Sequence, residues 1–147
     1  MSISVNPSVR SRPSIDAAAF GKVLELGGRV LLVSLFLLSG LTKLTSYGAT
    51  AAYMTATGVS AMLLPIVIAT EVLGSVAVIA GWHTRVAAFL LAGFTLLAAA
   101  LFHNDFGNQI QMIMFLKDVS IAGAFLMLVA NGAGPLSFDY RRAGRGT

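Results

Sequence analysis

FHNDFGNQIQMIMFLKD, residues 102–118, joins two long apolar runs and holds most of the polar chemistry of the chain. It gathers His103, Asp105, Gln109, Gln111, Lys117 and Asp118 within sixteen positions, whereas the flanking sequence is nearly all Leu, Ala, Val and Gly. Charged side chains at or inside an apolar segment cost about 2.5–3.5 kcal/mol each on insertion scales. The segment therefore predicts a polar turn between two membrane spans, followed by charges at the start of the second span.

The composition indicates that lipid solvates most of the chain. Hydrophobic residues make up 56% of its 147 residues and charged residues 11%, whereas a soluble domain carries roughly 25% charged residues. The net charge of +4 does not indicate nucleic-acid binding, because the basic residues mark segment ends and do not gather on one face. Cysteine is absent, which excludes disulfides, thiol chemistry and Cys-ligated zinc or iron–sulfur clusters.

The hydrophobic pattern predicts an all-α membrane protein, a four-transmembrane-helix bundle. A flexible polar tail (1–20) is expected to precede a membrane domain (21–138), and a basic tail (139–147) to follow it. The predicted spans are residues 23–44, 61–82, 86–102 and 112–131. Residues 45–60 should form a loop with a short interfacial helix near 49–57, and residues 81–85 a tight turn.

The first span has a competing interpretation as a signal peptide, because Ala49-Thr50-Ala51 resembles a cleavage site. A membrane bundle is favoured, since three further apolar segments follow and need a partner. The uncharged core of this span, residues 30–42, is only about 20 Å long against a bilayer core of about 30 Å. Arg29 and Lys43 at its ends must therefore snorkel outward or find partners inside the bundle.

The distribution of Lys and Arg predicts the orientation. Seven of them fall in the two tails, their flanks and the turn at 81–85, whereas only Lys43 and Lys117 lie toward the other side. The positive-inside rule then predicts that both termini lie on the cytoplasmic side of a bacterial inner membrane.

Glu71 is the residue that most needs an explanation. It lies about ten residues, roughly 15 Å, into its span and therefore near the bilayer midplane. A carboxylate at that depth is either protonated or paired with a cation, for which Lys43 and Lys117 are the candidates. Gly40 shares a helical face with Lys43, which predicts a close helix contact on that face.

Four further polar residues should approach Glu71 from the outer side. They are Lys43, His103, Lys117 and Asp118, and each has an ordinary structural explanation as well. The lysines serve elsewhere as snorkelling anchors, an interfacial histidine commonly bonds the backbone, and an aspartate near a helix start is favoured by the helix dipole. Their convergence with Glu71 is what indicates a site.

Several ordered motifs resemble the DoxX family of small bacterial inner-membrane proteins. They are GRVLL (28–32), FLLSGLTKL (36–44), AAYM (51–54), EVLG (71–74), FHN (102–104) and QMIMFLKD (111–118). The resemblance covers roughly residues 21–138 and implies a four-helix membrane bundle. Some relatives are subunits of a thiosulfate:quinone oxidoreductase, and others are associated with redox or oxidative-stress complexes.

Together these features favour a membrane subunit or partner of a quinone-linked redox complex. In this hypothesis Glu71 and His103 transfer protons, and Lys43, Lys117 and Asp118 hold a quinone-like headgroup. No cofactor motif or metal site is evident, and the two histidines, His83 and His103, lie too far apart along one helix to share a haem. Electrons must come from a partner subunit or from a bound cofactor that leaves no motif. The expected protein partner is such a subunit or a second copy of the chain in a homo-oligomer. The alternatives are a non-catalytic scaffold or assembly partner, and a small proton or solute conduit through Glu71.

Overall fold

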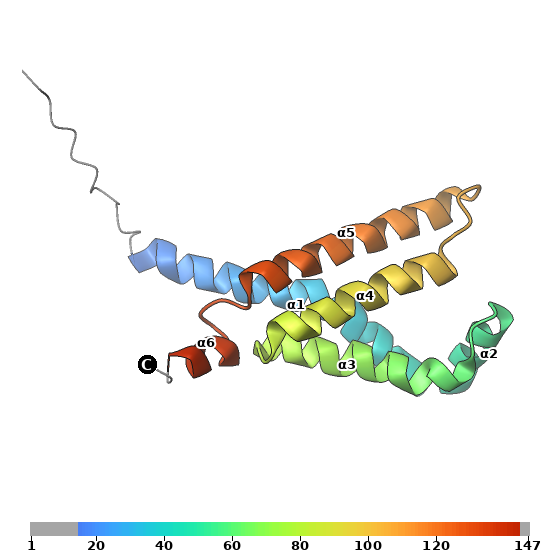
Figure 1. Cartoon of the computed structure of the whole chain (residues 1–147), viewed down its shortest axis with the longest axis horizontal. Coiled ribbons are helices and arrows are strands. Elements are labelled where there is room, and N and C mark those ends of the chain that lie inside the picture. The colour runs from blue at the N-terminus through green and yellow to red at the C-terminus, as the bar shows by residue number, and fades with distance from the viewer. Residues whose placement is uncertain (1–14, 145–147) are drawn as a thin grey trace, which may run out of the picture.

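The computed structural model describes residues 15–144, and it is helical apart from short connections (Figure 1). The elements of this part are α1 (Ile15–Thr45), α2 (Tyr47–Ala56), the 3₁₀ turn η1 (Ala61–Leu63), α3 (Leu64–Ala80), α4 (Thr84–Phe102), α5 (Gln109–Asn131) and α6 (Phe138–Ala143). Four of the described helices, α1, α3 with η1, α4 and α5, are long and apolar enough to cross a membrane. The predicted all-α fold with four spans is confirmed.

Two of the long helices begin earlier than expected, for local reasons. The helix α1 begins at Ile15, not near residue 23, because its first turns are rich in alanine, the strongest helix former. Residues 1–14 of the expected N-terminal tail lie outside the described residues. The helix α5 begins at Gln109, not at residue 112, because the side chain of Asn108 accepts hydrogen bonds from the backbone N–H groups of Ile110 and Gln111.

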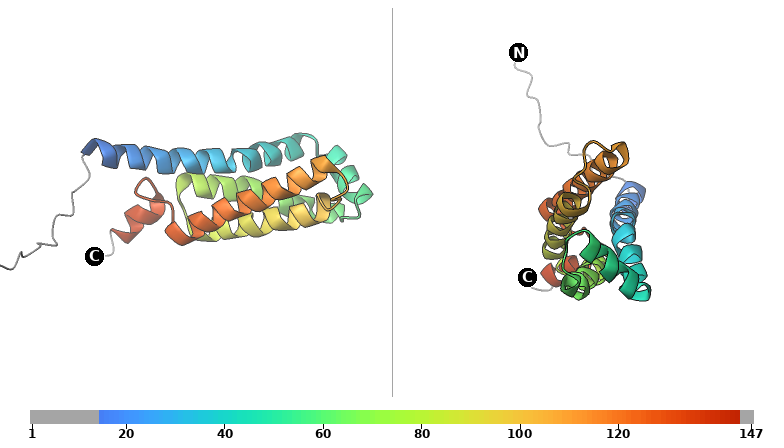
Figure 2. Two further views of the ribbon diagram at one scale, coloured as in Figure 1. Left: turned by 90° about the horizontal axis from the view of Figure 1, so that it is seen from above. Right: turned by 90° about the vertical axis from the view of Figure 1, so that its right-hand side faces the viewer.

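The long helices run alongside one another, with α2 at one end and α6 at the other (Figure 2). In sequence order, α1 packs on α3, α3 on α4 and α4 on α5. The middle of the bundle is closed by apolar side chains, among them Val33, Val78, Leu91 and Phe125. Phe36 of α1 meets Phe125 of α5 edge to face, with 5.4 Å between the ring centroids.

The expected interfacial helix exists as α2, and it covers the end of the bundle next to α3. Met54 of α2 is 4% exposed and packs against Leu64 and Ile68 of α3. The ring of Tyr53 stacks on Phe102 at the end of α4, with 5.9 Å between the centroids. The connection between the first two spans is thus a packed cover over the bundle, held by apolar contacts.

At the opposite end, the C-terminal segment is not only a basic tail, because part of it folds back as α6. The carboxylate of Asp139 accepts hydrogen bonds from the backbone N–H groups of His83 (2.9 Å) and Thr84 (2.8 Å). These donors belong to the first turn of α4, where the helix itself supplies no partner. Asp139 therefore caps α4 from a distant part of the chain and fixes the turn between α3 and α4.

Arg29, expected to snorkel or find a partner, is bound inside the protein at this same end. Its guanidinium donates to the carbonyl oxygens of Val78 (3.1 Å) and Ile79 (3.2 Å), and also to that of Leu136. Carbonyl groups at a helix C-terminus have no partner within the helix and carry partial negative charge. Arg29 thus caps α3 and ties the segment before α6 to α1.

Candidate functional site

A buried ion pair joins α1 to α3 in the half of the bundle near α2. The ammonium group of Lys43 lies 2.9 Å from both carboxylate oxygens of Glu71 and also donates to the hydroxyl of Ser39. Only 5% of the Glu71 side chain is exposed, against 24% for Lys43. Of the two partners considered from the sequence, Lys43 is the one that Glu71 has.

Gly40 is what lets the two helices approach closely enough for this pair. A Cβ atom at this position would lie 2.7 Å from the Val72 side chain and 3.1 Å from the Cβ of Glu71. Real Cβ contacts essentially never fall below 3.0 Å, so a larger residue at position 40 would force Val72 or the helices to shift. The close contact expected at Gly40 is confirmed, and it sets the position of Glu71.

A second polar group spans the turn between α4 and α5. The Nδ1 atom of His103 lies 2.8 Å from the Oε1 atom of Gln111, and its Nε2 atom lies 3.8 Å from the Oδ2 atom of Asp118. Lys117 approaches the other oxygen of Asp118 at 3.6 Å and the sulfur of Met114 at 3.3 Å. Because the amide oxygen can only accept, Nδ1 carries the hydrogen and Nε2 faces the carboxylate.

Both polar groups line one cavity of about 490 Å³ in the bundle half near α2. All five residues proposed from the sequence, Lys43, Glu71, His103, Lys117 and Asp118, belong to its wall, which is otherwise mainly apolar. Such a combination, a mostly apolar chamber with a few convergent polar groups, is typical of small-molecule sites. The main apolar and hydroxyl-bearing lining residues are Leu35, Phe36, Tyr53, Met54, Ile66, Val67, Thr70, Phe94, Thr95, Leu97, Ala98, Leu101 and Phe102.

The cavity wall differs in two respects from what the sequence indicated. Asp105 accepts from the backbone of Gly107 within the turn and does not line the cavity. The stacked rings of Tyr53 and Phe102 also form part of the cavity wall. Nothing in the residue types marked this role, because it depends on how α2 folds over the end of α4.

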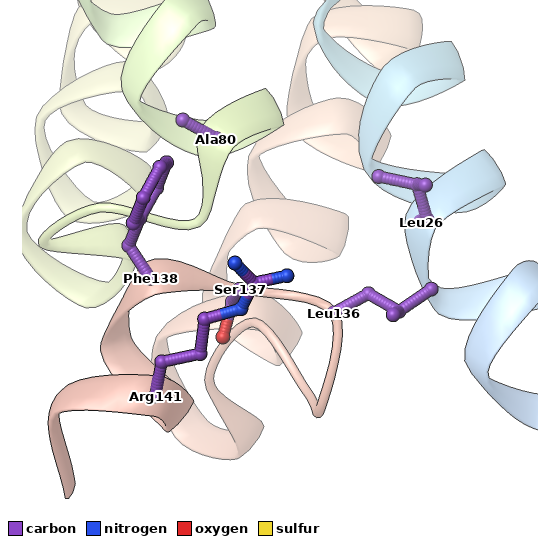
Figure 3. Close-up of a pocket in the computed structure, with 6 residues that line it drawn as sticks. All are labelled: Leu26, Ala80, Leu136, Ser137, Phe138 and Arg141. Atoms are coloured by element: carbon purple, nitrogen blue, oxygen red, sulfur yellow. The ribbon is translucent and has the colours of Figure 1, made fainter. Parts of the chain in front are cut away.

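Two smaller features at the α6 end are structural in character. A cavity of about 260 Å³ lies between α1, α3 and α6, where Phe138 points toward Ala80 and Leu136 toward Leu26 (Figure 3). Partial burial alone would raise the pKa of Asp139, but the hydrogen bonds from Thr84 and His83 outweigh it and hold the pKa below its usual range. This carboxylate is therefore adapted to its role as a helix cap.

The described helices and the cavity define a multi-pass α-helical membrane protein with two buried carboxylates, Glu71 and Asp118, near one end of its bundle. The DoxX family model matches residues 24–104, and the chain belongs to this family. The matched segment includes Lys43, Glu71 and His103 but ends before Lys117 and Asp118.

Two curated relatives are inner-membrane proteins of Escherichia coli K12. The chain is 43% identical to inner membrane protein YqjF over 114 residues, which cover 78% of this chain and 88% of the relative. It is 35% identical to inner membrane protein YphA over 133 residues, which cover 86% of this chain and 95% of the relative. No solved structure matches the chain. The protein is thus a multi-pass protein of the inner membrane.

Proposed function

We propose that this protein is the membrane subunit or partner of a quinone-linked redox complex, and that its cavity receives the quinone headgroup. One observation carries the proposal: five ionisable side chains from α1, α3, α5 and the end of α4 line a single cavity in a bundle whose middle is apolar. Ionisable groups inside a membrane bundle are costly and commonly mark a site or pathway.

The side chains around the cavity suit both redox states of such a headgroup. Quinone carbonyl oxygens accept hydrogen bonds, and the ammonium group of Lys117 is available as a donor. The ammonium group of Lys43 already donates to Ser39 and Glu71, so it contributes its positive charge. Quinol hydroxyl groups donate, and the carboxylates of Glu71 and Asp118 are acceptors. Because Asp118 lies beyond hydrogen-bond distance of both His103 (3.8 Å) and Lys117 (3.6 Å), we place the reacting oxygen beside these three side chains.

Proton exchange is assigned to His103 and Glu71. Quinone reduction takes up two electrons and two protons, and quinol oxidation releases the same number. With its Nδ1 hydrogen held by Gln111, His103 presents Nε2 to the cavity as the atom that gains or loses a proton. Glu71 is the second exchange group, and Lys43 contacts its carboxylate at 2.9 Å.

The electrons must come from, or go to, another protein. The chain has no cysteine, and no three of His, Asp or Glu within residues 15–144 gather closely enough to hold a metal ion. A one- or two-electron carrier on a partner subunit completes the balance. For this reason the proposal is a subunit of a complex and not a self-sufficient enzyme.

A scaffold role is the second candidate, because the Lys43–Glu71 pair also fixes how α1 sits on α3. In that case the polar groups would set helix register and dock a partner without binding a ligand. A conduit through Glu71 has less support. The fully buried apolar residues Val33, Val78, Leu91 and Phe125 separate the described polar cluster from the α6 end.

The test is binding of a short-chain benzoquinone to the purified protein in lipid nanodiscs. His103→Ala and Lys117→Met should each weaken binding at least about tenfold, as expected when a charge-assisted hydrogen bond is lost. Arg85→Met, which replaces an exposed cation at the α6 end, is the matched control and should leave binding unchanged. Equal binding by all three variants, compared at equal folded fraction, would eliminate the quinone site and leave the scaffold role.

A further inference from the structure

The cavity does not end at its polar groups but continues as an apolar groove between α3 and α4. Its wall includes Leu63, Ile66, Val67 and Thr70 on one side and Phe94, Leu97, Ala98 and Leu101 on the other. Each set follows the spacing of one helical face, so the two faces oppose each other along the helices. Thr70 supplies the only hydroxyl of this groove, and neither face carries a charge.

The groove opens toward lipid. Ile66 is 65% exposed and Leu97 58% exposed in the bare protein, and both lie on helices that cross the membrane. The two faces each cover eight residues, or seven steps along the helix, and are roughly 10 Å long at 1.5 Å per residue. A molecule lying in the groove would therefore touch the bilayer along its length and reach the polar cluster with one end.

We infer that the ligand of this cavity carries a hydrocarbon chain, which lies in the groove between α3 and α4 while its polar headgroup meets His103, Glu71 and the lysines. This inference rests on the proposed function and specifies the ligand class: a polyprenyl or acyl-chain molecule that enters sideways from the bilayer. A small water-soluble anion would use the cations but leave the apolar half of the wall without a partner.

The hydrocarbon chain of the ligand gains little from hydrophobicity alone, because the surrounding lipid is equally apolar. What the groove offers is close van der Waals packing along both helices, and Ala98 leaves the room for it. Substituting this alanine by a large side chain should therefore block binding of the hydrocarbon chain without affecting binding of the headgroup. The same helix supplies a matched control, Ala100, which is exposed to lipid outside the cavity wall.

The experiment compares Ala98→Phe with Ala100→Phe in nanodiscs, using a benzoquinone with a single isoprene unit and one with a long polyprenyl chain at equal mole fraction in the lipid. Ala98→Phe should weaken binding of the long-chain quinone about tenfold, an effect of losing several packed contacts. Binding of the one-unit quinone should change little, and Ala100→Phe should bind both like the unmodified protein. A photoreactive group on the long chain should cross-link to α3 and α4.

The possible results separate this inference from the proposed function. If both quinones bind the unmodified protein but Ala98→Phe weakens neither, the headgroup site stands and the groove is eliminated. Cross-links confined to α1 and α5 would also overturn the groove. If neither quinone binds the unmodified protein, the proposed function fails and this inference fails with it.

Discussion

Replacing Glu71 tests the element on which the site depends, the ion pair between α1 and α3. Glu71→Gln keeps nearly the same shape but removes the charge, so the ammonium of Lys43 stays in the cavity without its carboxylate. Breaking a buried pair from one side costs about 3–5 kcal/mol in soluble proteins. Because 24% of the Lys43 side chain is exposed and it can snorkel toward the surface, we expect a loss of about 2–3 kcal/mol in unfolding free energy.

Lys43→Met in the same chain should recover much of this loss, because an uncharged pair of similar volume removes the desolvation cost on both sides. The resulting coupling energy should be about 2 kcal/mol. Lys117→Met is the control, since Lys117 contacts Asp118 and Met114 and has no contact with Glu71. It should give no recovery in the Glu71→Gln background.

The measurement is reversible unfolding in mixed micelles with increasing SDS fraction, followed by circular dichroism, for the single and double variants. Additive losses for Glu71→Gln and Lys43→Met, within about 0.5 kcal/mol, would show that the two residues do not interact. Recovery by Lys117→Met instead would show that Glu71 has a different partner from the one described.

Two further predictions concern the ends of the bundle. Since the chain has no native cysteine, Gly48→Cys should react with an impermeant thiol reagent in intact cells and Gly144→Cys should be shielded, and the reverse pattern would invert the orientation predicted from the basic residues. Asp139→Asn should lower stability at neutral pH by about 1 kcal/mol, because it weakens the cap of Thr84 and His83. Because the pKa of Asp139 is lowered in the folded protein, its contribution to the unfolding free energy is present above the unfolded pKa near 3.9 and is lost as pH falls through the lower folded value. The melting temperature of the variant should therefore fall less between neutral and acidic pH than that of the unmodified protein. An unchanged acid profile would contradict this role.

The arrangement of spans was predictable from sequence because it follows from local hydrophobicity. Each span is a predominantly apolar run, and in lipid such a run has to be helical to satisfy its own backbone. The exact helix ends were less predictable, since they depend on caps such as the Asn108 side chain. The capping of α4 by Asp139 was not predictable at all, because 55 positions separate the aspartate from Thr84.

The candidate site was likewise predictable only in part from the sequence. Glu71 stood out because an unpaired carboxylate in the membrane is too costly, so the residue had to be either protonated or paired with a cation. Which cation it is depends on the contact of α1 with α3, which Gly40 permits, and that contact places Lys43 within 2.9 Å. The stacked rings of Tyr53 and Phe102 depend on the path of α2.

The sequence by itself determined that this is a four-span membrane protein, that Lys43, His103, Lys117 and Asp118 approach Glu71 from one end, and that Glu71 must be protonated or paired with a cation. These properties follow from the free energy of placing each residue in lipid, which depends on the residue and its depth. Only the tertiary structure decided that Lys43 is the partner, that five ionisable residues share one cavity, and that this cavity continues as a groove between α3 and α4. Those properties depend on which helix faces meet, and helices in lipid meet through packing and backbone approach, which no single residue determines.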